Sequence, residues 1–72
     1  MAFDFSKLRG RIVEKYGSCA AFAEAAGYTP GQISRRLNNQ TPFDDKEIHT
    51  FCQLLEIPGQ ELSTYFFTPK VR

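Results

Sequence analysis

The stretch AAFAEAAGYTPGQISRRLNN, residues 20–39, contains two short helical patterns separated by a glycine. The first pattern is rich in alanine, the strongest helix former, whose small side chain also lets a second helix approach closely. Gly27 supplies the positive φ that a sharp turn needs. In the second pattern Ile33 and Leu37 are four residues apart, so both lie on one helix face. Together, Ala23, Gly27 and Ile33 predict two helices that cross tightly.

The second helix of this pair has a strong start signal. Thr29 is its N-cap, and Pro30 takes the first helical position, where its missing N–H does no harm. Gln32 follows Thr29 by three residues, which is the spacing of a capping box. We therefore predict a helix over residues 30–38, preceded by a helix over residues 19–26.

Three further helices are predicted outside this stretch, over residues 5–16, 45–55 and 58–67, because apolar residues recur there at intervals of three and four. Nothing alternates with a period of two over a useful length, so no sheet is expected. The predicted fold is all-α, with five short helices. It forms a single domain over residues 1–72, with an ordered core over about 5–67.

Charge is distributed unevenly along the chain, although its net value is only +1. Basic residues outnumber acidic ones in the first 40 residues, and the predicted helix 30–38 carries no acid. The basic charge is thus concentrated in the half that holds this helix. The acids of the second half are Asp44, Asp45, Glu47, Glu56 and Glu61.

Catalytic, metal and membrane functions find little support in the sequence. A chain of 72 residues buries only about 60% of its unfolded surface and leaves no room for a deep cleft. The single histidine, His49, and the cysteines Cys19 and Cys52 match no zinc-site spacing. We expect no enzyme activity, metal, cofactor or small-molecule substrate. With neither a secretory leader nor an apolar run of about 20 residues, we expect a cytoplasmic protein with reduced thiols and no membrane partner.

The stretch 20–39 resembles the helix-turn-helix of the Cro/C1-type, or lambda-repressor-like, DNA-binding family. DKEIHTFCQLLEIPGQELSTYFF, residues 45–67, fits the later helices of that family. The resemblance covers about residues 5–67 and is closest to small stand-alone Cro-like regulators of temperate bacteriophages, a group that includes antirepressors. It implies a helix-turn-helix at helices 19–26 and 30–38, in the cytoplasm of a bacterial host.

In this family the second of the two helices enters the major groove of DNA. The resemblance therefore implies a transcriptional regulator of a phage lysogeny/lysis switch that reads double-stranded operator DNA. Arg35 would pair with guanine and Gln32 with adenine. The alternative for Arg35 and Arg36 is a face that only meets water, and for Ser18 a plain helix cap. The predicted DNA-binding residues are Ser18, Thr29, Gly31, Gln32, Arg35, Arg36, Asn38 and Asn39. Lys7, Arg9 and Arg11 either add long-range attraction or face solvent.

Some residues depart from the family pattern. Pro30 and Gly31 stand where base-contacting side chains are common, and Arg36 stands where many relatives have an apolar residue. These departures favour an alternative function, an antirepressor that binds a partner phage repressor and blocks its DNA-reading surface.

The aromatic C-terminal segment is the predicted partner interface of that alternative, because one helix face cannot bury two adjacent phenylalanines. The competing interpretation is that both rings wrap around the core. A homodimer through helix 58–67 and the tail is also possible. Phe3 and Phe43 are expected to help close the core. The predicted interface residues are Tyr65, Phe66 and Phe67.

Overall fold

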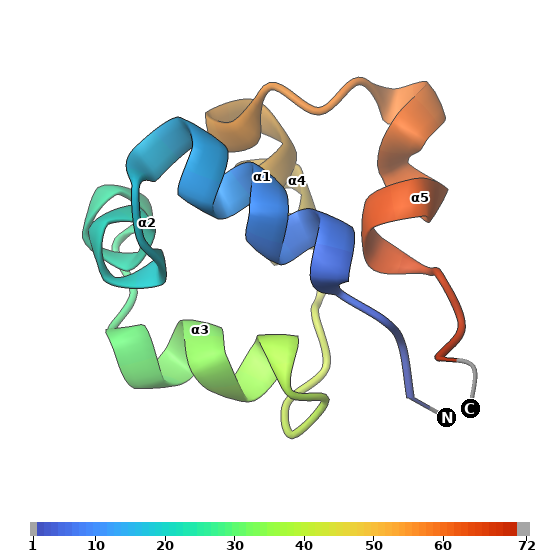
Figure 1. Ribbon diagram of the computed structural model, residues 1–72, viewed down its shortest axis with the longest axis horizontal. Helices are drawn as coiled ribbons and strands as arrows, with labels where there is room; N and C mark the ends of the chain where they lie inside the picture. Colours follow the sequence, from blue (N-terminus) through green and yellow to red (C-terminus); the bar gives the residue numbers. More distant parts are fainter. Residues whose placement is uncertain (1, 71–72) are drawn as a thin grey trace.

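The computed structural model describes residues 2–70, which form five α-helices and one 3-10 helix (Figure 1). The predicted all-α fold with five helices is confirmed. Within residues 2–70 extended pairing is limited to an isolated bridge between Phe3 and Pro69. The elements are α1 (Ser6–Tyr16), α2 (Cys19–Ala26), α3 (Pro30–Leu37), α4 (Asp45–Leu55), η1 (Gly59–Glu61) and α5 (Leu62–Phe66).

The turn between α2 and α3 depends on Gly27. Its φ of 83° lies in the left-handed region, which glycine adopts without strain. This conformation lets the N–H of Tyr28 donate to the carbonyl of Ala23 at 2.8 Å, which closes the end of α2. Ala23 and Ile33 are fully buried. In Figure 1 α2 is seen end-on while α3 lies across the view, so the two helices cross steeply as predicted.

The end of α4 is held by side chains of α1. Tyr16 donates its hydroxyl to the carbonyl of Leu54 at 3.1 Å. Arg11 donates to the carbonyls of Leu55 and Glu56 at 2.8 and 3.1 Å. These bonds satisfy carbonyls that a helix end leaves without partners. The open question about Arg11 is thereby answered, because its side chain fastens α1 to α4 instead of facing solvent.

One core lies where the helices meet. Edge-to-face aromatic contacts, which stabilise beyond simple burial, run through it. The ring of Phe43 lies 5.1 Å from Phe51 and 5.2 Å from Phe66, measured between ring centroids. Phe3 and Phe43 are half-buried against this core, in agreement with the prediction. The buried apolar residues are Phe5, Leu8, Ile12, Phe22, Ala23, Ile33, Leu37, Phe51, Leu55, Ile57 and Phe66.

The helix predicted over residues 58–67 is shorter than expected. Pro58, the first residue of the predicted helix, is extended, with ψ of 151°. The chain then makes one 3-10 turn, η1, before the five-residue helix α5. The two ends of the described chain lie side by side (Figure 1). Asp4 N–H donates to the carbonyl of Thr68 at 2.8 Å, and Lys70 N–H donates to that of Ala2 at 3.2 Å.

Candidate functional site

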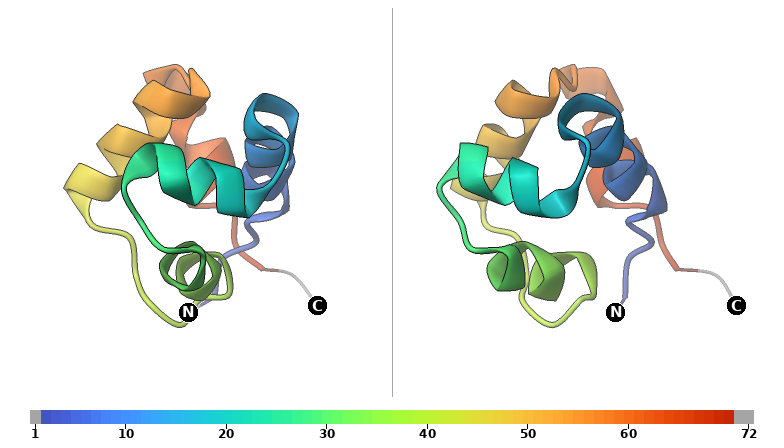
Figure 2. Two further views of the ribbon diagram at one scale, coloured as in Figure 1. Left: turned by 90° about the vertical axis from the view of Figure 1, so that its left-hand side faces the viewer. Right: turned by 60° about the vertical axis from the view of Figure 1, so that its left-hand side comes forward.

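The helix α3 lies at the edge of the molecule with its outer side uncovered (Figure 2). Its first turn is closed by the predicted capping box. The Thr29 hydroxyl accepts from the N–H of Gln32 at 3.2 Å, and the Gln32 side-chain oxygen accepts from the N–H of Thr29 at 2.8 Å. Ser18 caps α2 in the same way, accepting from the N–H of Ala21 at 3.0 Å. These side chains therefore stabilise helix ends in this structure.

Arg36 points into the protein instead of flanking the outer face. Its Nε donates to the Glu47 carboxylate at 2.9 Å, and its Nη2 forms an ion pair with the same oxygen. Its Nη1 donates to the carbonyl of Gln32 at 2.9 Å. The guanidinium carbon lies 5.3 Å from the centre of the Tyr28 ring, within range of a cation–π contact. Arg36 thus joins α3, α4 and the turn before α3.

The ion pair at the centre of this cluster has little contact with solvent. The side chains of Arg36 and Glu47 are 13% and 9% exposed. The hydrogen bond to Glu47 raises the pKa of the Arg36 guanidinium, and burial raises the pKa of the Tyr28 hydroxyl. The expectation that Arg36 reaches a phosphate is therefore not met by the structure. The Glu47 carboxylate binds the guanidinium group that would otherwise contact a phosphate.

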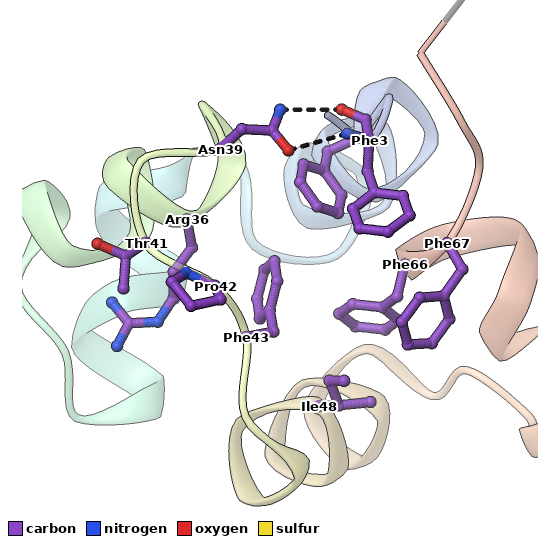
Figure 3. A pocket seen from close by; sticks show the side chains of 10 residues that line it. Phe3, Arg36, Asn39, Thr41, Pro42, Phe43, Ile48, Phe66 and Phe67 are labelled. Atoms are coloured by element: carbon purple, nitrogen blue, oxygen red, sulfur yellow. Dashed lines mark hydrogen bonds between the residues drawn. The ribbon is translucent and has the colours of Figure 1, made fainter. Parts of the chain in front are cut away.

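The two asparagines after α3 also make internal bonds. Asn38 accepts from Nη2 of Arg9 at 2.8 Å and donates to the Ser34 hydroxyl at 3.2 Å. Asn39 binds the backbone of Phe3 on both sides, accepting from its N–H at 2.9 Å and donating to its carbonyl at 3.0 Å. Figure 3 shows this paired contact. Asn39 therefore acts as a clamp on the N-terminal segment.

Arg35 is the predicted reader that keeps an exposed side chain. Within residues 2–70 it makes no side-chain hydrogen bond or ion pair, and Gly31 beside it is also exposed. A Cβ built on Gly31 would lie 3.6 Å from Nη1 of Arg35, so the guanidinium folds back along the helix. The structure consequently leaves one arginine, not a row of polar side chains, free on the outer side of α3.

The C-terminal aromatic residues are split between core and solvent. Phe66 is 1% exposed and Phe67 is 45% exposed, while Tyr65 is half-buried. The Phe67 ring is held on one side by Phe3, with centroids 5.8 Å apart and planes at 84°. Two adjacent rings thus have opposite surroundings, in agreement with the first of the two interpretations of the sequence and not with burial of both rings.

Phe67 borders a pocket of about 190 Å³ between the N-terminal segment, the α3–α4 loop, α4 and α5 (Figure 3). Its wall is mainly apolar, with Phe3, Pro42 and Ile48 beside the two C-terminal rings. The polar side chains Arg36, Asn39 and Thr41 also line it, and the first two have hydrogen-bond partners inside the protein. A group that enters this pocket therefore meets mainly apolar surface, which favours an apolar group.

Sequence reasoning missed several residues of this pocket. Phe3 and Phe43 were expected only to close the core, and Pro42 and Ile48 had no assigned role at this surface. The available signal was the large number of phenylalanines in a chain too short to bury all of them. The ion pair of Arg36 with Glu47 was harder to predict. Its one indication in the sequence was that Arg36 stands at a position where many relatives have an apolar residue.

Other kinds of site find no support among residues 2–70. Cys19 and Cys52 are free thiols. No group of three or more His, Cys, Asp or Glu side chains is placed to hold a metal ion in this part of the chain. None of its helices has the length and apolar character needed to cross a bilayer.

Comparison with known proteins gives a match to a protein family and a match to a solved structure. The family described as "Protein of unknown function (DUF739)" matches residues 1–69. The fold is similar to the solution structure of the modulator of repression (MOR) of the temperate bacteriophage TP901-1 from Lactococcus lactis, with a TM-score of 0.84 and 38% sequence identity. That match covers 100% of this chain and 97% of the other. No curated protein matches.

The main functional prediction, a regulator that reads operator DNA through α3, is wrong. The whole-length similarity is to a modulator of repression and agrees with the alternative, an antirepressor. The structure supplies the physical reason why the sequence was misleading. Gln32, Arg36 and Asn39 suit DNA chemically, but here they serve helix capping, a buried ion pair and a chain clamp. The DNA contacts predicted within residues 18–39 are withdrawn with that function.

Proposed function

The chain belongs to the family described as "Protein of unknown function (DUF739)", and we propose that it is a phage modulator of repression that acts by binding a phage repressor protein. The observation that carries this proposal is the whole-length similarity to the modulator of repression of bacteriophage TP901-1. The similarity extends over 100% of this chain and 97% of that chain. The proposed action is non-enzymatic and takes place in the cytoplasm of a bacterial host.

The surface around Phe67 supports binding to a protein. Contiguous exposed apolar surface marks interaction sites. Phe67 stands at the mouth of an apolar pocket, and the half-buried Tyr65 belongs to the same short helix. Aromatic side chains at such positions contribute much of the binding energy in protein interfaces. We therefore assign repressor binding to this aromatic surface, formed by Tyr65, Phe67 and the pocket of Figure 3.

Binding there would act on transcription through the repressor. A repressor holds its operator by a surface that faces the DNA, and a protein seated on that surface excludes the duplex. Homodimerisation through the predicted helix 58–67 and the tail stays a prediction, and sedimentation of the free protein would test it.

The test uses the repressor encoded beside this chain's own reading frame and its operator duplex. We expect that a molar excess of this protein abolishes the mobility shift that the repressor gives on its operator. The two proteins should also elute together in size-exclusion chromatography. A repressor shift that persists at every ratio, with separate elution at micromolar concentration, would contradict the proposal.

Two exposed apolar residues provide matched variants. Phe67→Ser removes the ring at the pocket, and Val13→Ser removes an equally exposed side chain on α1, since these residues are 45% and 51% exposed. We expect Phe67→Ser to weaken repressor binding at least about tenfold, which corresponds to about 1.4 kcal/mol. Val13→Ser should change the affinity less than about twofold, within the small effects typical of surface substitutions. Equal losses for the two variants would place the interface elsewhere.

A further inference from the structure

A second hollow runs along the outer face of α4. It is an open groove of about 650 Å³ whose opposite wall comes from η1 and α5. Asp45, His49, Cys52 and Glu56 line it at intervals of three and four residues, so one face of α4 borders it from end to end. An 11-residue helix is about 16 Å long, so the groove has the length of about three helical turns.

The floor of this groove is apolar. Ile48, Cys52 and Leu62 are half-buried there, and Phe67 is exposed at its edge. Burial raises the pKa of the Cys52 thiol, which keeps the floor uncharged at neutral pH. Ile48 and Phe67 also line the aromatic pocket of Figure 3, so the two hollows meet at these residues. The groove is thus continuous with the aromatic surface.

The charged groups at its rim are acidic. Asp45 lies at one end and Glu56 at the other, and neither lysine nor arginine lines the groove. Lys15 donates to the Glu56 carboxylate at 2.9 Å and lowers its pKa, so Glu56 stays ionised although part of its charge is compensated. Asp45 has no ion pair within residues 2–70. Besides Asp45 and Glu56, the ionisable side chains that line the groove are His49 and Cys52.

We propose that this groove receives a basic amphipathic helix of the repressor, the helix with which the repressor reads DNA. The inference rests on the proposed function and adds the surface and the chemistry of the contact. An apolar floor of helical length is the pattern of helix-in-groove recognition. A DNA-reading helix carries positive charge because it faces phosphates, so its basic residues complement Asp45 and Glu56. The repressor helix would then lie in this groove instead of in the major groove.

The test compares charge changes inside and outside the groove. Asp45→Lys reverses a charge at one end, and Gln53→Lys adds a positive charge at an exposed lining position nearer the other end. Glu24→Lys makes the same reversal as Asp45→Lys at an exposed position of α2, outside the groove. Each variant is first checked for an unchanged far-UV spectrum and thermal transition. Affinity for the purified repressor is then measured by calorimetry with the full chain.

We expect Asp45→Lys and Gln53→Lys each to weaken repressor binding about tenfold or more, while Glu24→Lys stays within about twofold. Wild-type affinity should also fall as salt is raised, because the contact depends on opposite charges. If the wild type binds but both groove variants bind equally well, the inference is overturned and the proposed function stands. If only Asp45→Lys loses affinity, the inference is also overturned, because the effect then belongs to the start of α4. If the wild type itself does not bind, the proposed function fails.

Discussion

Two side chains of this protein lie where their chemistry alone would not place them. Arg36 is charged, yet its side chain is 13% exposed, whereas Phe67 is apolar and 45% exposed. Arg36 is internal because Glu47, the carbonyl of Gln32 and the ring of Tyr28 satisfy its guanidinium. Phe67 is external because its neighbour Phe66 already fills the core position that α5 offers.

The difference shows what decides burial in a small domain. A charged group is tolerated inside when every donor has a partner, and a large ring stays outside when the helix has only one inward face. The first arrangement serves the fold, since it joins α3 to α4. The second leaves an aromatic ring exposed beside the apolar pocket of Figure 3.

The largest expected effect comes from Arg36→Ala. This variant leaves the Glu47 carboxylate buried without its partner, which typically destabilises a protein by about 3–5 kcal/mol. The loss is a large fraction of the stability expected for 72 residues, roughly 4–11 kcal/mol. Chemical unfolding measures it, and the adjacent variant Arg35→Ala is the control, expected within about 0.5 kcal/mol because Arg35 is exposed. Equal losses would show that the ion pair has no special role.

The next effect should come from Phe67→Ala. Removing this half-exposed ring loses the edge-to-face contact with Phe3, at 5.8 Å, which is worth about 0.5–1.5 kcal/mol. The same unfolding measurement applies. A loss smaller than that of Arg36→Ala would sharpen the comparison, because the apolar residue would then matter less to the fold than the charged one. A loss above about 3 kcal/mol would instead make Phe67 part of the core.

A comparable effect is expected from Asn39→Gly. Glycine accepts the φ of 64° at this position, so the backbone is preserved while both hydrogen bonds to Phe3 are lost. We expect a loss of about 1 kcal/mol and faster amide exchange at Phe3. Asn38→Ala is the control, since Asn38 does not contact Phe3, and amide exchange at Phe3 should stay unchanged. Unaltered exchange in Asn39→Gly would show that the clamp does not hold the N-terminal segment.

The smallest effect concerns an exposed ion pair, in contrast to the buried one. Lys15 lowers the pKa of Glu56 below its ordinary value of 4.5. The stability contributed by this pair is therefore present above about pH 4.5 and is lost as the pH falls through the lowered pKa. An NMR titration of the Glu56 carboxylate should move back toward 4.5 in Lys15→Met. Lys7→Met should leave that titration unchanged, and identical curves for all three proteins would exclude the pairing.

The helices were predictable because their signals are local. The caps Ser18 and Thr29 each accept a hydrogen bond from a backbone N–H three residues later, as the sequence indicates. The turn at Gly27 and the buried face of α3 also follow from spacing alone. The 3-10 turn η1 was missed, because after Pro58 the choice between 3-10 and α-helical turns depends on how the segment packs.

The site was predictable only in part. That two adjacent phenylalanines cannot share one inward face follows from helix geometry, so an exposed ring near residue 67 could be foreseen. Which of the two rings is buried, and the presence of Phe3 and Ile48 in the same pocket, required the tertiary structure. The main functional prediction failed because it treated polar side chains on α3 as free. Their hydrogen-bond partners can be distant in the sequence: Asn39 binds Phe3, which is 36 residues away.

By itself, the sequence determined that this chain forms five short helices with a tight crossing at Gly27, since capping, glycine conformation and apolar spacing act over a few residues. Only the tertiary structure decided which polar groups remain available to a partner. Arg36 and Arg35 are neighbours with the same chemistry, yet one is bound to Glu47 from another helix and the other is exposed. Availability depends on residues brought together by folding, and no local pattern contains that information.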